Sequence, residues 1–422
     1  MILPIDEGSL TNVEKVEVLS VGTELLMGQI ANTNAQYISR RMPEVGMGVF
    51  YHSVVGDNPQ RLEACLKLAM ERSDVIITTG GLGPTQDDLT KETVAQALGL
   101  QMELHAPSRD RIKAYFESAG RVMVESNFRQ AYFPSGSLIM ENDEGTAPGC
   151  IVVSGEKVVV MLPGPPRELI PMFDRHVLPY FKKLHQDMLH SKFLRVVGIG
   201  ESLVEQKILS LVNGQTNPTI ATYAKDGIVT LRITAHDENG ISGKELADRM
   251  SRDVVALLGD NVYTTEDEEL EHTVFRLLRE KGLHFACAES CTGGLLAEKM
   301  TSVPGASAVF ECAAVTYSNA AKINFLGVDP AVIAQYGPVS KETALAMVQA
   351  AAKISKAQAA VSITGYAGPD AGDRPVGTVF IGVKAPGTEY AEEFHFTGNR
   401  ERIRTLSVIN ALDLVRKAIL KL

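Results

Sequence analysis

The sequence predicts a multidomain α/β protein, and three observations indicate this fold class. At 422 residues, the chain is longer than one ordinary domain. Residues 16 to about 184 alternate short β-branched runs with helical stretches, which is typical of a parallel sheet covered by helices. The segment 191–262 has the pattern of a small α+β module, and a second α/β unit begins at Leu270. We therefore expect three domains, at 1–185, 186–264 and 265–422.

The N-terminal unit should contain a parallel sheet. Three short runs that end in glycine are expected as its strands, namely Val16–Gly22, Phe50–Gly56 and Asp74–Gly80. Helical stretches lie between these strands, at Gln29–Met42 and Pro59–Ser73. Two further strands joined by a tight turn are expected at Cys150–Ser154 and Lys157–Leu162. A long helix should start after Pro165-Pro166, since proline suits the first helical turn.

The two later units are expected to mix helices and strands. The middle module should contain a strand, a helix, a hairpin around Lys225-Asp226-Gly227 and a second helix, with the regular elements at Phe193–Ile199, Ser202–Val212, Thr219–Ala224, Ile228–Ala235 and Lys244–Leu258. The C-terminal unit should begin with helix, strand, helix and strand at Leu270–Lys281, Leu283–Ala288, Gly293–Thr301 and Ala308–Tyr317. The acidic run 266–269 before it has the pattern of a solvated linker.

The composition argues against several classes of protein. A net charge of −10 argues against a protein that binds the phosphate backbone of nucleic acids. Five scattered cysteines are too few for a disulfide framework. No run reaches the ~18 apolar residues that suggest a membrane span, and the N-terminus has no signal-peptide pattern. We therefore expect a cytoplasmic protein that binds neither nucleic acid nor membrane.

The C-terminal unit carries a candidate nucleophile at Ser290, where an apolar run changes into a glycine-led helical pattern. A serine hydroxyl needs a base, and Lys322 is the best candidate. With Asn319 as a helix cap, Lys322 would lie near the positive helix end, which favours the neutral amine. Tyr317 could relay a proton or orient the serine. Free amides at the helix start predict a site for an anion or oxyanion, at Thr292, Gly293 and Gly294.

Other interpretations of this pattern stay open. The run around Ser290 could be only a tight strand–helix junction, with Lys322 as a surface lysine. Cys291 is a rival nucleophile, because thiolates are favoured near a helix start. A metal site at Cys287 and Cys291 lacks a second pair of ligands.

Two later segments of the chain are expected to form walls of a ligand site. Small hydroxylated residues at the carboxyl end of a strand commonly face a site in open α/β sheets. The first segment, 361–370, carries Ser362, Thr364 and Gly365 and runs into a glycine loop, and the second segment is 374–379. Arg400, just before the last predicted helix, could hold a phosphate.

The N-terminal unit carries glycines and carboxylates in three loops at the same ends of its predicted strands. Glycine lets the backbone approach a phosphate, and carboxylates suit a hard cation such as Mg²⁺. The candidate metal ligands are Glu24, Asp57, Asp87 and Asp88. Two more bent loops follow, and the candidate substrate-binding residues are Gly22, Glu24, Gly80, Gly81, Gly83, Thr85, Gly145, Pro163 and Gly164. The alternative for Asp87 and Asp88 is that either one only caps a helix.

Over about 265–422, the chain resembles the nicotinamide mononucleotide (NMN) deamidase domain of the CinA family, in the runs AESCTGG, VTYSNAAK, SITGYAGPD, RPVGTVFIG and GNR. The resemblance implies that Ser290 is the nucleophile, assisted by Tyr317 and Lys322. It implies hydrolysis of the NMN carboxamide to nicotinate mononucleotide and ammonia, without a cofactor. Cys287 and Tyr366 depart from residues common in the family, and Tyr366 could alter how the nicotinamide ring stacks.

Over about 16–184, the chain resembles the N-terminal half of the same family, in the runs GTELLMGQIANTN, GGLGPTQDDLT, GTAPG and PGPPRE. That half has a three-layer α/β fold shared with molybdopterin-binding proteins. The resemblance implies an ADP-ribose pyrophosphatase that forms AMP and ribose 5-phosphate with Mg²⁺, Mn²⁺ or Co²⁺. Asp88 is then the first choice for an essential catalytic carboxylate. Related folds bind a pterin without hydrolysis, which is the alternative for this unit.

The middle segment resembles a KH-type module, but its Gly-x-x-Gly at Gly240–Gly243 lies between a strand and a helix, so RNA binding is not supported. Together the resemblances imply a bifunctional hydrolase of pyridine-nucleotide salvage. We expect a homodimer on general grounds. The competing class is a non-catalytic pterin-binding, nucleotide-binding or scaffold protein linked to competence or DNA damage.

Overall fold

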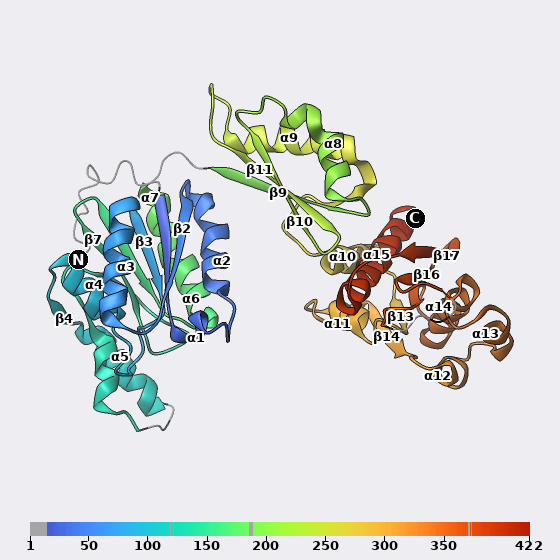
Figure 1. The fold of residues 1–422 in the computed structure, drawn as a ribbon, viewed down its shortest axis with the longest axis horizontal. Coiled ribbons are helices and arrows are strands. Elements are labelled where there is room, and N and C mark those ends of the chain that lie inside the picture. The colour runs from blue at the N-terminus through green and yellow to red at the C-terminus, as the bar shows by residue number, and fades with distance from the viewer. Residues whose placement is uncertain (1–14, 119, 121, 185–188, 370–371, 373) are drawn as a thin grey trace. The chain divides into compact units, whose positions relative to one another are not determined.

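Figure 1 shows the computed structural model of the protein, which describes residues 15–118, 120, 122–184, 189–369, 372 and 374–422. The chain divides into two compact units, one formed by residues 1–191 and 236–243 and the other by 192–235 and 244–422. In this described part, none of the helices combines the length and apolar composition needed to cross a bilayer.

A six-stranded sheet forms the centre of the first unit, in the order β2-β1-β3-β8-β7-β6. The four parallel strands are β1 (Lys15–Val21), β2 (Gly48–Val55), β3 (Val75–Thr79) and β8 (Lys157–Leu162). β7 (Gly149–Ser154) pairs antiparallel with β8, and β6 (Leu138–Met140) pairs antiparallel with β7. The predicted parallel sheet is confirmed, and so is the tight turn that joins β7 to β8. The carboxyl ends of β1, β2, β3 and β8 all lie at one edge.

Helices cover both faces of this sheet (Figure 1). The alternation along β3 explains the two layers, because Val75 and Ile77 join one hydrophobic cluster while Ile76 joins the other. The first cluster packs against α2 (Thr33–Arg41), α6 (Pro166–Met172) and α7 (Leu178–Leu184). The second packs against α3 (Pro59–Arg72) and α4 (Thr90–Leu98). The long helix expected after Pro165 is α6 and α7, joined by a π-helical segment at Phe173–Val177.

The first unit also has elements that the sequence did not predict. A small two-stranded sheet pairs β4 (Met102–Leu104) with β5 (Tyr132–Pro134). The short helices are α1 (Thr23–Leu26) and the 3₁₀ segments Met42–Val45 and Glu125–Ala131, and a longer helix is α5 (Ala106–Ser118).

The second unit begins with the small α+β module. Its sheet has the order β10-β11-β9-β12, with β9 (His190–Val197), β10 (Thr219–Lys225), β11 (Ile228–Ala235) and β12 (Val262–Thr264). Its helices are α8 (Glu201–Val212), α9 (Gly243–Leu258) and a 3₁₀ turn at Gly259–Asn261. The predicted hairpin is confirmed, and Asp226 and Gly227 both have positive φ, at 50° and 83°, as a tight hairpin turn requires.

The rest of the second unit surrounds a five-stranded sheet in the order β14-β13-β15-β16-β17. The strands β13 (Phe285–Glu289), β14 (Phe310–Val315) and β15 (Ala359–Gly365) pair in parallel. β16 (Thr378–Ala385) pairs antiparallel with β15, and β17 (Thr388–His395) pairs antiparallel with β16. One face packs on α10 (Leu270–Glu280), α11 (Leu295–Thr301) and α15 (Arg400–Leu420). The other faces α12 (Asn319–Asn324), α13 (Pro330–Tyr336) and α14 (Lys341–Ser355), and a 3₁₀ turn occurs at Ala306–Ala308.

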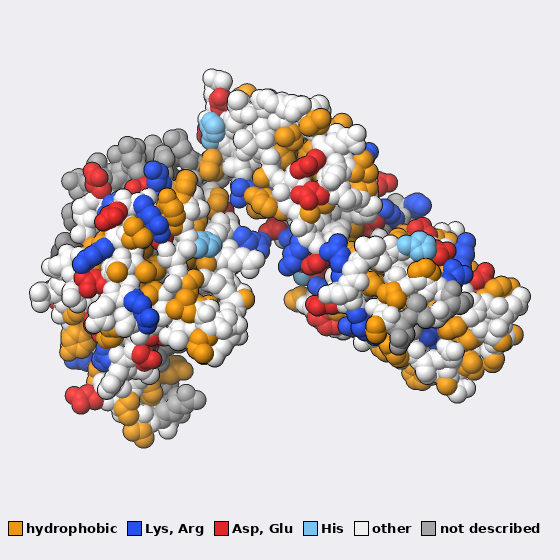
Figure 2. Space-filling view, in the orientation of Figure 1, with side chains coloured by type: hydrophobic (Ala, Val, Ile, Leu, Met, Phe, Trp, Pro, Cys, Tyr) orange, Lys and Arg blue, Asp and Glu red, His pale blue; other side chains and the backbone are white. Residues whose placement is uncertain are grey.

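Figure 2 shows acidic and basic side chains interspersed on the visible face of each unit. This mixture agrees with a chain whose excess of acidic residues is modest, at a net charge of −10.

Candidate active site

Ser290 lies in the turn between β13 and α11, at the carboxyl end of β13, which lies between β14 and β15 in the C-terminal sheet. Its amide donates to the carbonyl oxygen of Ile363 on β15 at 2.9 Å, and its own carbonyl accepts from the amide of Gly293 at 3.1 Å. The serine is 7% exposed. Its backbone is thus fixed by the neighbouring strand, at the edge where open α/β sheets commonly bind ligands.

Lys322 meets this serine directly. Its Nζ donates to Ser290 Oγ at 3.0 Å and to the carbonyl oxygen of Thr316 at 2.9 Å. The lysine is 1% exposed. Burial lowers the pKa of Lys322 from 10.5 to about 8, because removal from water penalises the charged ammonium. Lys322 Nζ is therefore close enough to Ser290 Oγ to take its proton, and the lowered pKa makes the neutral amine accessible near neutral pH.

The cap and the helix position expected for Lys322 were wrong. The helix cap is Ser318, whose hydroxyl accepts from the amide of Ala321, and not Asn319. Lys322 is the fourth residue of a six-residue helix rather than the third. Desolvation by burial lowers the pKa of the lysine.

The expected anion site at the start of α11 was also wrong at Gly293 and Gly294. The amide of Gly293 is used by Ser290, and the amide of Gly294 donates to the carboxylate of Glu289 at 3.0 Å. Within the described residues, the free amides of this turn belong to Cys291 and Thr292. Of these two, Cys291 directly follows the nucleophile and lines the cavity described below, which is where a nucleophile turn commonly supplies an oxyanion donor, whereas Thr292 is fully buried.

The rival nucleophile Cys291 is unfavourable. Burial raises the pKa of its thiol to about 11, so the reactive thiolate is scarce at neutral pH. Burial likewise raises the pKa of Cys287 well above its usual value. Ser290, with a base at hydrogen-bond distance, is the better nucleophile of the two neighbouring residues.

A cavity of about 460 Å³ opens beside Ser290 and Lys322. Among the other predicted residues, Tyr317, Thr364, Gly365 and Arg400 line it. Thr292, Gly293 and Gly294 do not line it, since the turn presents only Ser290 and Cys291 to this space. Ser362 was predicted wrongly as a ligand wall: it is fully buried, and its hydroxyl donates to the carbonyl oxygen of Ala344 in α14 at 2.6 Å. The cavity is also lined by four further residues of the predicted wall segment 361–370, namely Tyr366, Ala367, Gly368 and Pro369. The lining residues that sequence reasoning did not assign to the wall are Asn319, Pro338 and Val339.

Tyr317 and Arg400 are joined at this cavity. Arg400 Nη2 donates to the Tyr317 hydroxyl at 2.8 Å, and Nη1 donates to the carbonyl oxygen of Gly368 at 2.6 Å. Tyr317 is 61% exposed, and the partner of its hydroxyl is Arg400 rather than Ser290. The tyrosine thus orients a cation that could bind a phosphate.

The candidate residues of the N-terminal unit follow β1, β2, β3 and β8 at one sheet edge. Asp57 accepts from the amide and hydroxyl of Thr23, at 2.9 and 2.8 Å, which ties the loop after β2 to the start of α1. Asp88 accepts from the amide of Thr85 at 3.0 Å and also from its hydroxyl. A hydrogen bond from the Thr85 side chain lowers the pKa of Asp87. The N-cap of α4 is Leu89, so neither aspartate caps that helix.

These carboxylates are not gathered into a ready metal site. In the described part of the chain, no three His, Cys, Asp or Glu side chains lie close enough to hold one ion. The predicted set of Glu24, Asp57, Asp87 and Asp88 therefore does not form a preassembled cage.

Glycines let the loops at this edge approach closely. Gly80 has a φ of 98°, and a Cβ there would lie 2.2 Å from the carbonyl oxygen of Val21. Gly164, after Pro163, is also near Gly80, with a built Cβ 3.5 Å from its Cα. Added Cβ atoms at Gly81, Gly83 and Gly22 would meet the side chains of Thr90, Asp88 and Glu24. The close approach between the first and third strand loops explains why glycine is needed at position 80.

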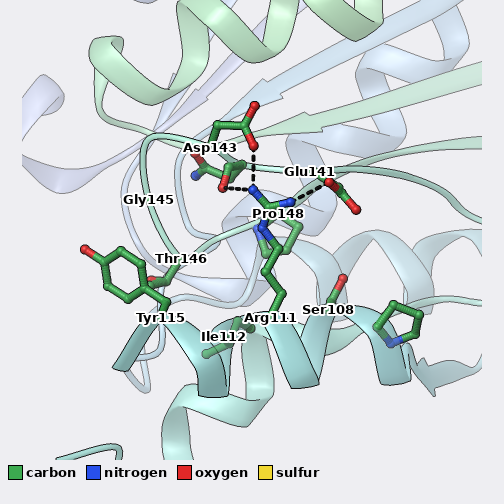
Figure 3. Close-up of a pocket in the computed structure, with 11 residues that line it drawn as sticks. Ser108, Arg111, Ile112, Tyr115, Glu141, Asp143, Gly145, Thr146 and Pro148 are labelled. Atoms are coloured by element: carbon green, nitrogen blue, oxygen red, sulfur yellow. Dashed lines mark hydrogen bonds and ion pairs between the residues drawn. The ribbon is translucent and has the colours of Figure 1, made fainter. Parts of the chain in front are cut away.

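Figure 3 shows a second pocket, of about 80 Å³, in the same unit. Arg111 of α5 reaches the loop that carries Gly145 and pairs with Glu141 and Asp143, each at 2.5 Å. Tyr115 and Thr146 also line this pocket. A Cβ on Gly145 would lie 2.3 Å from a carboxylate oxygen of Glu168. Sequence reasoning found Gly145 but missed Arg111, because α5 was not predicted.

Comparison with known proteins identifies the family. Residues 17–183 match the family model described as "Probable molybdopterin binding domain", 191–264 match "Damage-inducible protein CinA KH domain", and 267–419 match "CinA C-terminal domain". A "Putative competence-damage inducible protein" of Acetivibrio thermocellus is 50% identical over 409 residues, which cover 96% of this chain and 99% of the relative. The chain belongs to the CinA family. A "CinA-like protein" of Dictyoglomus turgidum is 46% identical over 410 residues, with 97% and 100% coverage.

The expected fold class and the resemblance to the CinA family are thus confirmed. Ser290 and Lys322 lie in the region that matches the CinA C-terminal domain. Asp57 and Asp88 lie in the region that matches the molybdopterin-binding domain. The Gly-x-x-Gly of the CinA KH region lies between the end of β11 and the start of α9.

Proposed function

We propose that the C-terminal unit hydrolyses the carboxamide of NMN to nicotinate mononucleotide and ammonia. The observation that carries this proposal is the 3.0 Å contact between Lys322 Nζ and Ser290 Oγ beside the cavity. The cavity, at about 460 Å³, has a volume typical of small-molecule sites. Burial adds to the argument, since it lowers the pKa of the lysine toward the range where a base works near neutral pH.

The first half of the reaction is acyl transfer to the serine. Neutral Lys322 takes the proton of Ser290 Oγ as that oxygen attacks the carboxamide carbon. The carbonyl oxygen becomes negatively charged, and the amide of Cys291, a residue that lines the cavity, is the donor of this turn available to it. The lysine ammonium then gives its proton to the departing nitrogen. The C–N bond breaks, ammonia leaves, and an ester links the acyl group to Ser290.

The second half releases the product with the same base. Lys322, neutral again, takes a proton from a water that attacks the ester carbon. The serine oxygen leaves with the proton that the lysine returns to it. The products are nicotinate mononucleotide and the free enzyme, so no cofactor is required by this scheme.

The far wall of the cavity suits the phosphate of the substrate. Arg400 lines the cavity, and its guanidinium is held by Tyr317 and by the Gly368 carbonyl. A guanidinium is well matched to phosphate oxygens. Arg400 would bind the phosphate, with Tyr317 holding the arginine in place.

Product analysis tests this activity. The purified chain given NMN should form nicotinate mononucleotide and ammonia in equal amounts. Folded protein that forms neither product would favour the competing class, a binding or scaffold protein linked to competence or DNA damage.

For the N-terminal unit, we propose metal-dependent hydrolysis of ADP-ribose to AMP and ribose 5-phosphate. The glycine-lined approach of the loops at Gly80 and Gly164 favours a diphosphate at this sheet edge. A divalent cation such as Mg²⁺, Mn²⁺ or Co²⁺ would offset the charge of the diphosphate and activate a water. Mg²⁺ is often held by one or two carboxylates together with substrate phosphates. Asp88, supported by Asp57, Asp87 and Glu24, would supply those carboxylates.

The competing function of this unit is pterin binding. Tight binding of a pterin without AMP release from ADP-ribose would favour it. With both activities, the chain would serve pyridine-nucleotide salvage in the cytoplasm, and we propose a homodimer as its working form.

A further inference from the structure

A fully buried carboxylate lies directly before the nucleophile. Glu289 is the last residue of β13 and is 0% exposed. Its Oε2 accepts from the amides of Gly294 and Leu296 at 3.0 and 3.2 Å, and its Oε1 accepts from the amide of Ala297 at 2.9 Å. The N-cap residue of α11, Gly294, has no side chain to cap the helix. Glu289 therefore caps the helix from five residues upstream.

The backbone of the same residue is fixed in the sheet. The carbonyl oxygen of Glu289 accepts from the amide of Thr316 at 2.7 Å, and Glu289 pairs with Ile363 on the other side. Main chain and side chain of one residue thus hold the two ends of the turn 290–294. From α15, Arg404 adds a third fixed point by donating to the carbonyl oxygen of Thr292 at 3.2 and 2.6 Å.

The Glu289 carboxylate also determines which backbone amides of the turn remain free to bind an oxyanion. It takes the amide of Gly294 and two amides of the first turn of α11, so these cannot bind an oxyanion. The amides of Cys291 and Thr292 are the free donors of this turn among the described residues. An oxyanion donor works only when it is held in place before the reaction.

We propose that Glu289 is a positioning residue for the deamidation proposed above. It holds the turn so that Ser290 Oγ and the free amide of Cys291, a residue that lines the cavity, keep one fixed arrangement. A carboxylate is needed because it only accepts hydrogen bonds. A glutamine would have one accepting oxygen for three amides, and its NH₂ group would face an N–H donor.

The substitution Glu289→Gln tests this role, with Glu298→Gln as the matched control. Glu298 is an exposed residue of the same helix. For Glu289→Gln we expect kcat with NMN to fall on the order of 100-fold, as for loss of oxyanion alignment, while KM changes little. Glu298→Gln should behave as wild type. A folded Glu289→Gln protein with wild-type kcat, or with KM raised and kcat unchanged, would overturn the proposal.

A second variant and a second measurement complete the test. If Glu289→Gln does not fold, Glu289→Asp keeps the charge and both oxygens on a shorter side chain, and it should still lose kcat without a change in KM. The rate at which a fluorophosphonate labels Ser290 measures the reactivity of the serine in the absence of NMN. This labelling rate should fall in the same variants. Unchanged labelling and unchanged kcat in Glu289→Asp would contradict the role of Glu289. Wild type that is labelled but does not hydrolyse NMN would instead contradict the proposed substrate.

Discussion

Lys322 Nζ lies 3.0 Å from Ser290 Oγ, although 32 positions separate the two residues in the chain. The parallel pairing of β13 with β14 explains this contact, because it aligns Glu289 with Val315. The turn after β13 and the helix α12 that follows β14 consequently begin at the same sheet edge. The sheet brings a nucleophile and a base together without any histidine.

Replacement of Lys322 should abolish most of the deamidase activity. Lys322→Met keeps the apolar stem but removes the amine that takes the serine proton. We expect kcat with NMN to fall by about 10²–10⁴-fold, the range typical of a lost general base. Lys341→Met, at an exposed residue of α14, is the control and should retain activity. Steady-state ammonia release measures both variants, and a Lys322→Met protein within a few fold of wild type would remove the lysine from the mechanism.

The deamidase rate should rise with increasing pH. Burial lowers the pKa of Lys322 to about 8, and the base must be neutral to act. The rate should therefore rise with pH through about 8 and level off above it. A pH profile of kcat/KM for NMN checks this expectation. A rate that is flat between pH 6.5 and 9.5 (a range of about 1.5 units on either side of the expected midpoint) would contradict a lysine base.

Arg400 should act on the phosphate of the substrate rather than on the chemistry. Arg400→Gln removes the cation that Tyr317 and Gly368 hold at the cavity. We expect KM for NMN to rise by about 10-fold or more, the loss of one charge-assisted contact of about 1.5–3 kcal/mol, with a smaller change in kcat. With nicotinamide riboside, which lacks the phosphate, the KM values of the variant and of wild type should differ little. Arg402→Gln, an exposed neighbour in α15, is the control.

Much of this site could be predicted from the sequence, and the rest depends on long-range contacts. The motif around Ser290 and the lysine at 322 are local patterns, and the alternation of strands and helices placed both at strand ends. The cap of α11 by Glu289 could not be predicted, because a glutamate at the end of a strand has no local signature of its side-chain partner. Ser362 was misassigned for a related reason: its strand is buried on both faces, so small polar residues can point into a packed helix as well as into a site.

The metal proposal for the N-terminal unit has its own test. Asp88→Ala should remove AMP release from ADP-ribose and leave NMN hydrolysis intact, because Asp88 lies in the unit without Ser290. Chelation of divalent cations should have the same effect on wild type. Asp110→Ala, at an exposed site on α5, is the control. Nucleotide chromatography measures AMP, and turnover retained by Asp88→Ala would exclude this carboxylate from the reaction.

Ammonia release from NMN by Ser290→Ala tests the central claim most directly. The substitution removes the single oxygen proposed to attack, and Ser302→Ala, at an exposed serine after α11, matches it chemically. The account predicts that wild type and Ser302→Ala release ammonia and nicotinate mononucleotide together, while folded Ser290→Ala releases neither. Ammonia release by Ser290→Ala at the wild-type rate would contradict the serine–lysine mechanism.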